Sequence, residues 1–232
     1  MLITAVGRKL LESSMDRGWV LEPDAKKLLA DAGLAVPRFV FATSKEAALR
    51  AAREIGYPLV AKIVSPAALH KSDVGGVVVG LETDDVLGDV FDRFSRIEGF
   101  LGVHLEETVK GVELIIGAKI DFQFGPVVLL GIGGTGVELY QDTAIRMAPL
   151  TPKDIASMVD SLKARKLLTG YRGAPPVNLE NLTQTLMRFS TLVLEISDRI
   201  ESIDLNPVIC TADACVVADA RMMTAKSIPN RN

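Results

Sequence analysis

Hydrophobic and polar residues follow helical spacing in two segments of the N-terminal part of the chain. Apolar residues recur at this spacing over residues 23–32, and Gly33 supplies a stop after them. Thr43 and Glu46 have the spacing of a capping box, which predicts a second helix that runs to residue 55. Short apolar runs alternate with these helices, so the pattern predicts a compact α/β lobe. The other elements expected in it are strands at 38–42, 59–64, 76–81 and near Val103, and a helix from Asp84.

After residue 106 the pattern changes to longer apolar runs of β type. VELIIGAKI and PVVLLGI are joined by DFQFG, which is typical of a hairpin and predicts an antiparallel sheet in a second lobe. Thr151 and Pro152 stand where a helix N-cap and its first residue are expected, and residues 178–197 have a longer amphipathic pattern. Two further strands, IESIDL and CVVADA, are predicted around a turn in which Asn206 precedes proline.

Composition narrows the class of protein. The 232 residues can bury a substantial core in one large domain or two small lobes, and 48% hydrophobic with 24% charged residues is ordinary globular usage. A net charge of −3, with both signs interspersed, disfavours a nucleic-acid partner. The apolar runs are too short to span a membrane and no signal-peptide core is visible, so we expect a cytoplasmic protein without a membrane partner.

Three segments suit the phosphates and the base of a nucleotide. Lys62 lies among apolar residues of LVAKIV, where a buried amine needs an anion; the alternative is a lysine on the solvent face of a half-exposed strand. Residues 106–113 join the lobes and can offer main-chain groups to an adenine edge, while Glu113 accepts from ribose hydroxyls. A solvated charged turn is the alternative there. The glycine-rich run 131–136 permits close approach to a phosphate, but a tight turn would look the same.

Three oxygen-bearing side chains are expected to converge near the C-terminus. Asp204 and Asn206 alternate on one predicted strand, and Asp219 recurs on the next. Magnesium prefers such oxygen ligands together with nucleotide phosphates. A simple turn at Asn206 would leave two acidic residues within apolar strands unexplained. The sequence therefore predicts a Mg²⁺ site.

The chain has two histidines and two cysteines. His70 lies in the polar segment SPAALHKSDVGG, where an imidazole can act as a nucleophile towards phosphorus, although an isolated loop histidine is more often a solvated surface residue. His104 lies on a predicted strand and is interpreted as structural. Cys210 and Cys215 are interpreted as reduced, packed thiols.

Taken in order, several motifs resemble the ATP-grasp portion of NDP-forming acyl-CoA synthetases, a family that includes ADP-forming acetate–CoA ligases and is related to succinyl-CoA synthetase. The similarity covers nearly the whole chain. The motifs are EPDAKKLLADAGLAVP, YPLVAKIVSPAALHKSDVGGVVVGL, EETVKGVELIIGAKID, FGPVVLLGIGG, RMAPLT, and IDLNPVI with VVADAR.

The resemblance implies an α+β (α/β) ATP-grasp fold whose nucleotide binds in the cleft between a smaller lobe, 21–104, and a larger lobe, 1–20 with 105–232. It implies ATP or ADP and Mg²⁺ as cofactors. His70 matches the phosphoryl carrier, Arg146 an arginine near the phosphates, and Lys62 the lysine that holds them. The adenosine-binding connector is matched by Glu106, Glu107, Val109 and Glu113, and the magnesium set by Asp204, Asn206 and Asp219.

Two features depart from the family pattern. A bulkier residue is expected where the glycine loop has Thr135 and Gly136, and no CoA-binding Rossmann domain precedes the ATP-grasp portion. We therefore expect a hetero-oligomer with a CoA-binding alpha subunit that carries a second phosphohistidine. The expected function is reversible phosphoryl transfer between ATP and histidine during acyl-CoA synthesis. Two alternatives are a stand-alone ATP-grasp carboxylate–amine ligase and a non-catalytic nucleotide sensor.

Overall fold

The computed structural model describes residues 2–134, 142–171, 173 and 175–225. The chain forms two compact units, one built from residues 1–36 with 110–232 and the other from residues 37–109. The smaller lobe expected from the sequence was 21–104. In the structure, helix α2 (Glu22–Asp31) packs instead with elements of the larger unit, α1 (Ala5–Ser14) and β11 (Arg221–Thr224).

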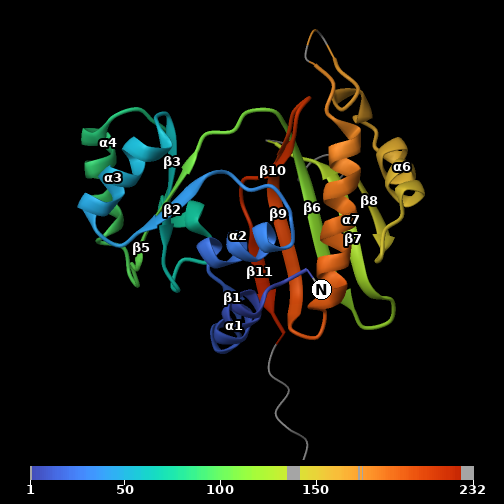
Figure 1. Cartoon of the computed structure of the whole chain (residues 1–232), viewed down its shortest axis with the longest axis horizontal. Helices are drawn as coiled ribbons and strands as arrows, with labels where there is room; N and C mark the ends of the chain where they lie inside the picture. The colour runs from blue at the N-terminus through green and yellow to red at the C-terminus, as the bar shows by residue number, and fades with distance from the viewer. Residues whose placement is uncertain (1, 135–141, 172, 174, 226–232) are drawn as a thin grey trace, which may run out of the picture. The chain divides into compact units, whose positions relative to one another are not determined.

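The larger unit contains an antiparallel sheet, as predicted, in the order β1-β11-β9-β6-β7-β8, with β10 also paired to β9 (Figure 1). The predicted hairpin is present, since β6 and β7 pair directly from Asp121 and Gly125 onward. The strands not yet bounded are β1 (Trp19–Val20), β6 (Val112–Asp121), β7 (Gly125–Ile132), β8 (Thr143–Met147), β9 (Ile200–Cys210) and β10 (Cys215–Val217).

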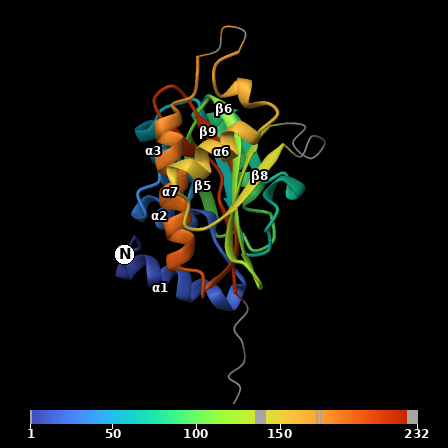
Figure 2. The same ribbon diagram turned by 90° about the vertical axis from the view of Figure 1, so that its right-hand side faces the viewer.

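One face of this sheet packs against α7 (Leu179–Glu195), and α6 (Pro152–Ser161) lies beside β8 (Figure 2). Leu114, Val128 and Leu130 from the strands join Leu186 and Phe189 of α7 in one buried core. Helix α6 begins as predicted, with Pro152 in the first turn and a capping box between Thr151 and Asp154. The short 3₁₀ turns are η1 (Met15–Arg17) and η3 (Arg165–Leu167).

The smaller unit is an antiparallel sheet of order β2-β5-β3-β4 packed against α3 and α4. Its core contains Ala48, Leu87 and Phe94 of the helices with Leu59 and Leu105 of the strands. The elements are β2 (Phe39–Ala42), α3 (Lys45–Ile55), β3 (Leu59–Val64), η2 (Lys71–Val74), β4 (Val77–Leu81), α4 (Asp84–Phe94) and β5 (Gly102–Glu107).

Two local predictions were wrong. The N-cap of α3 is Ser44 rather than Thr43, because the Ser44 side chain accepts from the backbone N–H of Ala47 at 3.2 Å. Asn206 and Pro207 do not form a turn between strands, since β9 continues through them to Cys210. Pairing of β6 with β9 is irregular at this point, and such a bulge accommodates a proline that cannot donate to the ladder.

Within the part of the chain that the structure describes, no helix is both long enough and apolar enough to cross a membrane.

Candidate nucleotide and metal site

The predicted magnesium ligands are brought together by the pairing of β9 with β10 and β11. Val217 of β10 is opposite Val208 of β9, and Arg221 of β11 is opposite Asp204. Both pairs have the same register along β9, and Asp219 lies midway between Val217 and Arg221. The same register therefore places Asp219 beside Asn206. The backbone N–H of Asp219 accordingly donates to the carbonyl of Pro207 at 3.4 Å. Asp219 lies between the two strands rather than on one, which corrects its predicted placement.

The carboxylate of Asp204 lies on the sheet face opposite α7. Its neighbours Ile203 and Leu205 belong to the core beneath α7, and Asp204 itself pairs with Gly117 of β6, which carries no side chain. Partial burial raises the pKa of Asp204, and Arg221, whose Nη2 lies 3.8 Å from Oδ2, opposes this shift. A carboxylate is a fitting ligand for a hard divalent cation, and Asn206 and Asp219 add further oxygen donors of the kind that Mg²⁺ prefers.

Glu113 and the start of the glycine loop form a hollow in the larger unit. Leu114 is opposite Ile132 in the β6–β7 pair, and the next residue, Gly133, donates its N–H to the Glu113 carbonyl at 2.7 Å. The hollow has a volume of about 400 Å³ and is lined by Gly111, Val112, Glu113, Ile132, Gly133, Gly134 and Leu167.

The glycines are needed in this hollow because a Cβ on Gly133 would lie 2.8 Å from the Glu113 carbonyl carbon. Glu113 and the glycine loop are far apart in the sequence, and the β6–β7 register brings them together. Thr135 and Gly136, the departures from the family pattern, lie outside the described residues.

Lys62 belongs to a buried charge cluster in the smaller unit. All residues of β3 are buried, so the solvent-face alternative for Lys62 is wrong. Its Nζ lies 2.8 Å from Oε1 of Glu106, and both side chains are less than 10% exposed, at 7% and 3%. The anion that Lys62 meets within this unit is therefore a carboxylate.

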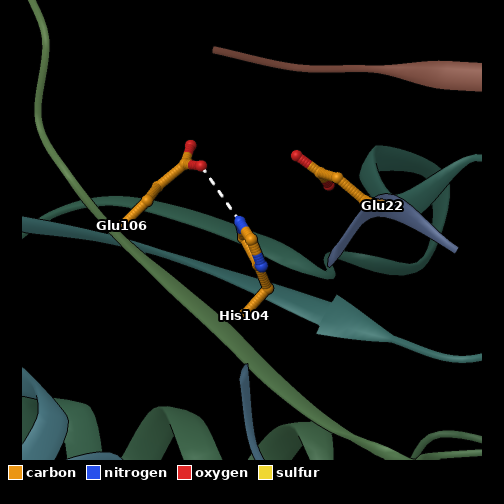
Figure 3. A group of neighbouring side chains, drawn as sticks. All are labelled: Glu22, His104 and Glu106. Carbon is orange, nitrogen blue, oxygen red and sulfur yellow. Dashed lines mark hydrogen bonds and ion pairs between the residues drawn. The ribbon is translucent and has the colours of Figure 1, made fainter. Parts of the chain in front are cut away.

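Glu106 also contacts His104, which lies on the same face of β5 two residues earlier. Nε2 of His104 is 3.2 Å from Oε2 of Glu106 (Figure 3), and the ring of Phe39 packs against the imidazole with centroids 4.8 Å apart. His104 is thus buried on a strand, as predicted. The i, i+2 spacing of His104 and Glu106 is the signal by which the sequence could have revealed this contact. Glu22, also labelled in the figure, belongs to the larger unit, where it is paired with Lys26 of the same helix at 3.6 Å.

The connector is shorter than the sequence suggested, because Glu106 and Glu107 are the last residues of β5. The carboxylate of Glu107 accepts from the backbone N–H of Arg38 at 2.9 Å and from its Nε at 2.7 Å. Burial raises the pKa of Glu107, but the two hydrogen bonds from Arg38 outweigh this effect and hold the pKa below its usual range. Val109, half-buried, is the last residue of the smaller unit.

Arg146 lies on β8 opposite Val128, whose side chain is in the core beneath α7. The Arg146 side chain therefore extends from the face of the sheet that α7 covers. Its guanidinium donates to Ser157 Oγ of α6 and to the carbonyl of Ile145, both at 2.8 Å. Asp204 points to the opposite face of the same sheet. The structure does not group Arg146 with the magnesium set, and its place near the phosphates stays a prediction.

His70 is an exposed residue immediately before the 3₁₀ turn η2, on the segment that links β3 to β4. This segment is fixed at both ends. Ser65 Oγ donates to the carbonyl of Glu98 at 2.7 Å, and the carbonyl of Gly76 accepts from the backbone N–H of Ile63 in β3 at 2.8 Å. The imidazole therefore lies on a short exposed turn between two anchored strands.

Comparison with known proteins identifies the family. A model of the ATP-grasp domain matches residues 12–224. The beta subunit of ADP-forming acetate–CoA ligase I from Pyrococcus furiosus is 36% identical over 228 residues, covering 94% of this chain and 98% of that subunit. The ADP-forming 4-hydroxybutyrate–CoA ligase of Nitrosopumilus maritimus is 38% identical over 213 residues, which are 88% of this chain and 30% of that longer protein.

Solved structures agree with this result. Acetyl-coenzyme A synthetase 1 of Ca. Korarchaeum cryptofilum, in complex with coenzyme A and Mg-AMPPCP, is 39% identical with a TM-score of 0.84, covering 94% of this chain and all of that one. The fold is the predicted α+β ATP-grasp fold. The chain therefore belongs to the ATP-grasp family and, within it, is a ligase of the type of the beta subunits of ADP-forming acetate–CoA ligases.

Proposed function

We propose that this chain is the nucleotide-binding subunit of an ADP-forming acyl-CoA synthetase and that it transfers a phosphoryl group between ATP and a histidine. The observation that carries the proposal is the β9 register, which places Asp219 beside Asn206 and two residues along the strand from Asp204. A set of oxygen ligands of this kind suits a magnesium–nucleotide complex. The family relationship supports the same assignment.

Asp204, Asn206 and Asp219 would hold the Mg²⁺, which when bound neutralises charge on the nucleotide phosphates. Glu113 would accept hydrogen bonds from the ribose hydroxyls at the hollow that it forms with Gly133 and Gly134. Lys62 would bind a phosphate oxygen, for which the phosphate must compete with the carboxylate of Glu106. The connector around Glu107 and Val109 would meet the adenine, and Arg146 would act near the phosphates.

His70 would be the phosphoryl carrier. A ring nitrogen attacks the γ-phosphorus, the bond from this phosphorus to the bridging oxygen breaks, and ADP leaves. The exposure of His70 supports this role, because the nucleophile must reach a phosphate. The Korarchaeum structure supports it further, since in that protein a phosphohistidine segment points towards the nucleotide binding site.

A partner would complete the reaction. We propose a CoA-binding alpha subunit with its own phosphohistidine, in a hetero-oligomer in which the phosphoryl group passes to a carboxylic acid and CoA then displaces it. The beta-subunit relatives and the longer single-chain ligases support this division of labour.

Phosphate labelling tests the proposal. The complete complex incubated with Mg-ATP labelled at the γ-phosphate is expected to carry acid-labile, base-stable phosphate on His70. His70→Ala should lose this label and overall turnover while retaining nucleotide binding, whereas His104→Gln, at the only other histidine of the chain, should keep the label. Full turnover by His70→Ala would show that the partner's histidine meets the nucleotide directly. Acyl-CoA synthesis by the isolated chain would contradict the subunit assignment.

A further inference from the structure

The two cysteines of the chain face each other across a pair of strands. Cys210, the last residue of β9, is directly opposite Cys215, the first residue of β10, and both are free thiols buried in the larger unit. They pack in the core that also contains Val208 and Val217. Free cysteines are commonly buried, so burial by itself does not indicate a reaction between them. The geometry of the strand pair is the informative feature.

The hydrogen bonds around the pair identify its type. The N–H of Thr211 donates to the carbonyl of Ala214 at 2.8 Å, so Thr211 and Ala214, the next pair towards the turn, are a hydrogen-bonded pair. Pairs alternate along an antiparallel ladder, so Cys210 and Cys215 are a non-hydrogen-bonded pair. Two positions further along β10, the N–H of Val217 points away from β9 and donates to the carbonyl of Ala35 at 2.8 Å, as the same alternation requires.

This pair type suits a disulfide. The Cα atoms of a non-hydrogen-bonded antiparallel pair are about 4.5 Å apart and their side chains are close together. Disulfides span Cα separations from about 4.4 to 6.8 Å, so a bond between these residues needs no displacement of either strand.

The two thiols differ in their access to solvent. A hollow of about 230 Å³ opens between the first half of α7 and the β9–β10 turn, and Cys215 is one of its lining residues whereas Cys210 is not. Asn181, Arg188 and Asp213 also line it, so its walls are largely polar. The hydrogen bond with Cys215, together with burial, raises the pKa of the Cys210 thiol. Cys210 is therefore the protonated inner thiol and Cys215 the outer one.

We propose that Cys210 and Cys215 form a reversible intramolecular disulfide, with Cys215 as the thiol that a small disulfide oxidant reaches through this hollow. The Cys215 thiolate attacks one sulfur of the oxidant, forms a mixed disulfide and releases one thiolate of the oxidant. Cys210 then gives its proton to solvent and attacks the Cys215 sulfur, which expels the second thiolate. The two cysteines lose two electrons, and the oxidant is reduced to two thiols.

The experiment treats the natively folded chain with oxidised glutathione and measures the intact mass and the free thiols. The wild-type protein is expected to lose the mass of two hydrogen atoms and both free thiols and to form no disulfide between chains. Dithiothreitol should restore both free thiols. Cys210→Ala should instead retain one glutathione on Cys215, because no inner thiol completes the exchange. Cys215→Ala should stay unmodified until it is unfolded.

Thermal unfolding of both variants verifies that each is folded before treatment. Wild-type protein that reacts only after denaturation, or that gives a disulfide between two chains, would overturn the proposal. So would glutathione on Cys215→Ala at the rate seen for Cys210→Ala, because Cys210 would then be equally accessible. The inference does not depend on the proposed phosphoryl transfer, since neither cysteine is assigned a role there.

Discussion

Lys62 and Glu106 form an ion pair of 2.8 Å inside the smaller unit, with both side chains almost fully buried. Lys62 is directly opposite His104 in the β3–β5 pair, and Glu106 lies two residues further along β5. The Glu106 carboxylate therefore contacts the Lys62 ammonium on the neighbouring strand and the His104 imidazole on its own strand. A buried pair of this kind contributes little relative to an apolar pair, but removal of one member is costly. The presence of this ion pair in a buried strand fits the phosphate-binding role proposed for Lys62.

Glu106→Gln should therefore destabilise the protein. The substitution keeps the side-chain volume but leaves the Lys62 ammonium without this carboxylate, and we expect the free energy of unfolding to fall by about 3 kcal/mol. Urea denaturation measures the change. Asp92→Asn is the matched control, since Asp92 pairs with Lys45 at a similar distance, 2.7 Å, on the surface of the same unit. The control should lose less than about 1 kcal/mol. Equal losses would mean that burial of the Lys62 pair has no energetic consequence.

The magnesium assignment predicts a specific effect of Asp219→Asn. Loss of one anionic oxygen should weaken magnesium-dependent nucleotide binding by about tenfold or more, with little change in thermal stability because the side chain is only half-buried. Isothermal titration with Mg-ADP gives the affinity. Asp213→Asn, in the exposed turn after β9, removes the same charge elsewhere in the larger unit and should have little effect. Unchanged affinity in Asp219→Asn would show that another group holds the metal.

Gly133→Ala should damage the hollow beside Glu113. The added methyl would lie 2.8 Å from the carbonyl carbon and 2.9 Å from the carbonyl oxygen of Glu113, so the backbone must move. We expect lower thermal stability and weaker nucleotide binding. Gly117→Ala on β6 is the control for stability, because there the nearest atom would be the Ile203 carbonyl oxygen at 3.6 Å, an ordinary contact. A Gly133→Ala protein as stable as Gly117→Ala would contradict the close approach.

Tyr57 should titrate late. Burial, followed by the hydrogen bond that its hydroxyl donates to Asp84 Oδ1 at 2.8 Å, raises the pKa of Tyr57 to about 12. An unfolded tyrosine titrates near pH 10, so the folded state holds this proton more tightly. The resulting stability is fully present below about pH 10 and is lost as the pH rises towards 12. Ultraviolet absorbance of tyrosinate, compared between the wild type and Tyr57→Phe, isolates this residue. A Tyr57 titration near pH 10 would exclude the Asp84 contact.

Elements that depend on neighbouring residues could be predicted from the sequence. The helix start at Thr151 and Pro152 and the hairpin between β6 and β7 follow from residues a few positions apart, and the structure confirms both. The six residues of β3 likewise occupy the predicted strand. The ordered motifs also indicated the ATP-grasp family, which the comparisons confirm.

Contacts between residues far apart in the sequence depend on how the strands pair in the folded chain. Asp219 lies beside Asn206 because β9 continues through Pro207 instead of turning there. The Arg146 side chain extends from the sheet face opposite to that of Asp204 because Arg146 pairs with Val128. Glu106 meets Lys62 because β3 and β5 are neighbours. Strand pairing brings together residues far apart in the chain, and a shift of one position reverses the face on which each side chain lies. Local patterns of hydrophobic and polar residues do not specify that register, which is set by the packing of the whole sheet.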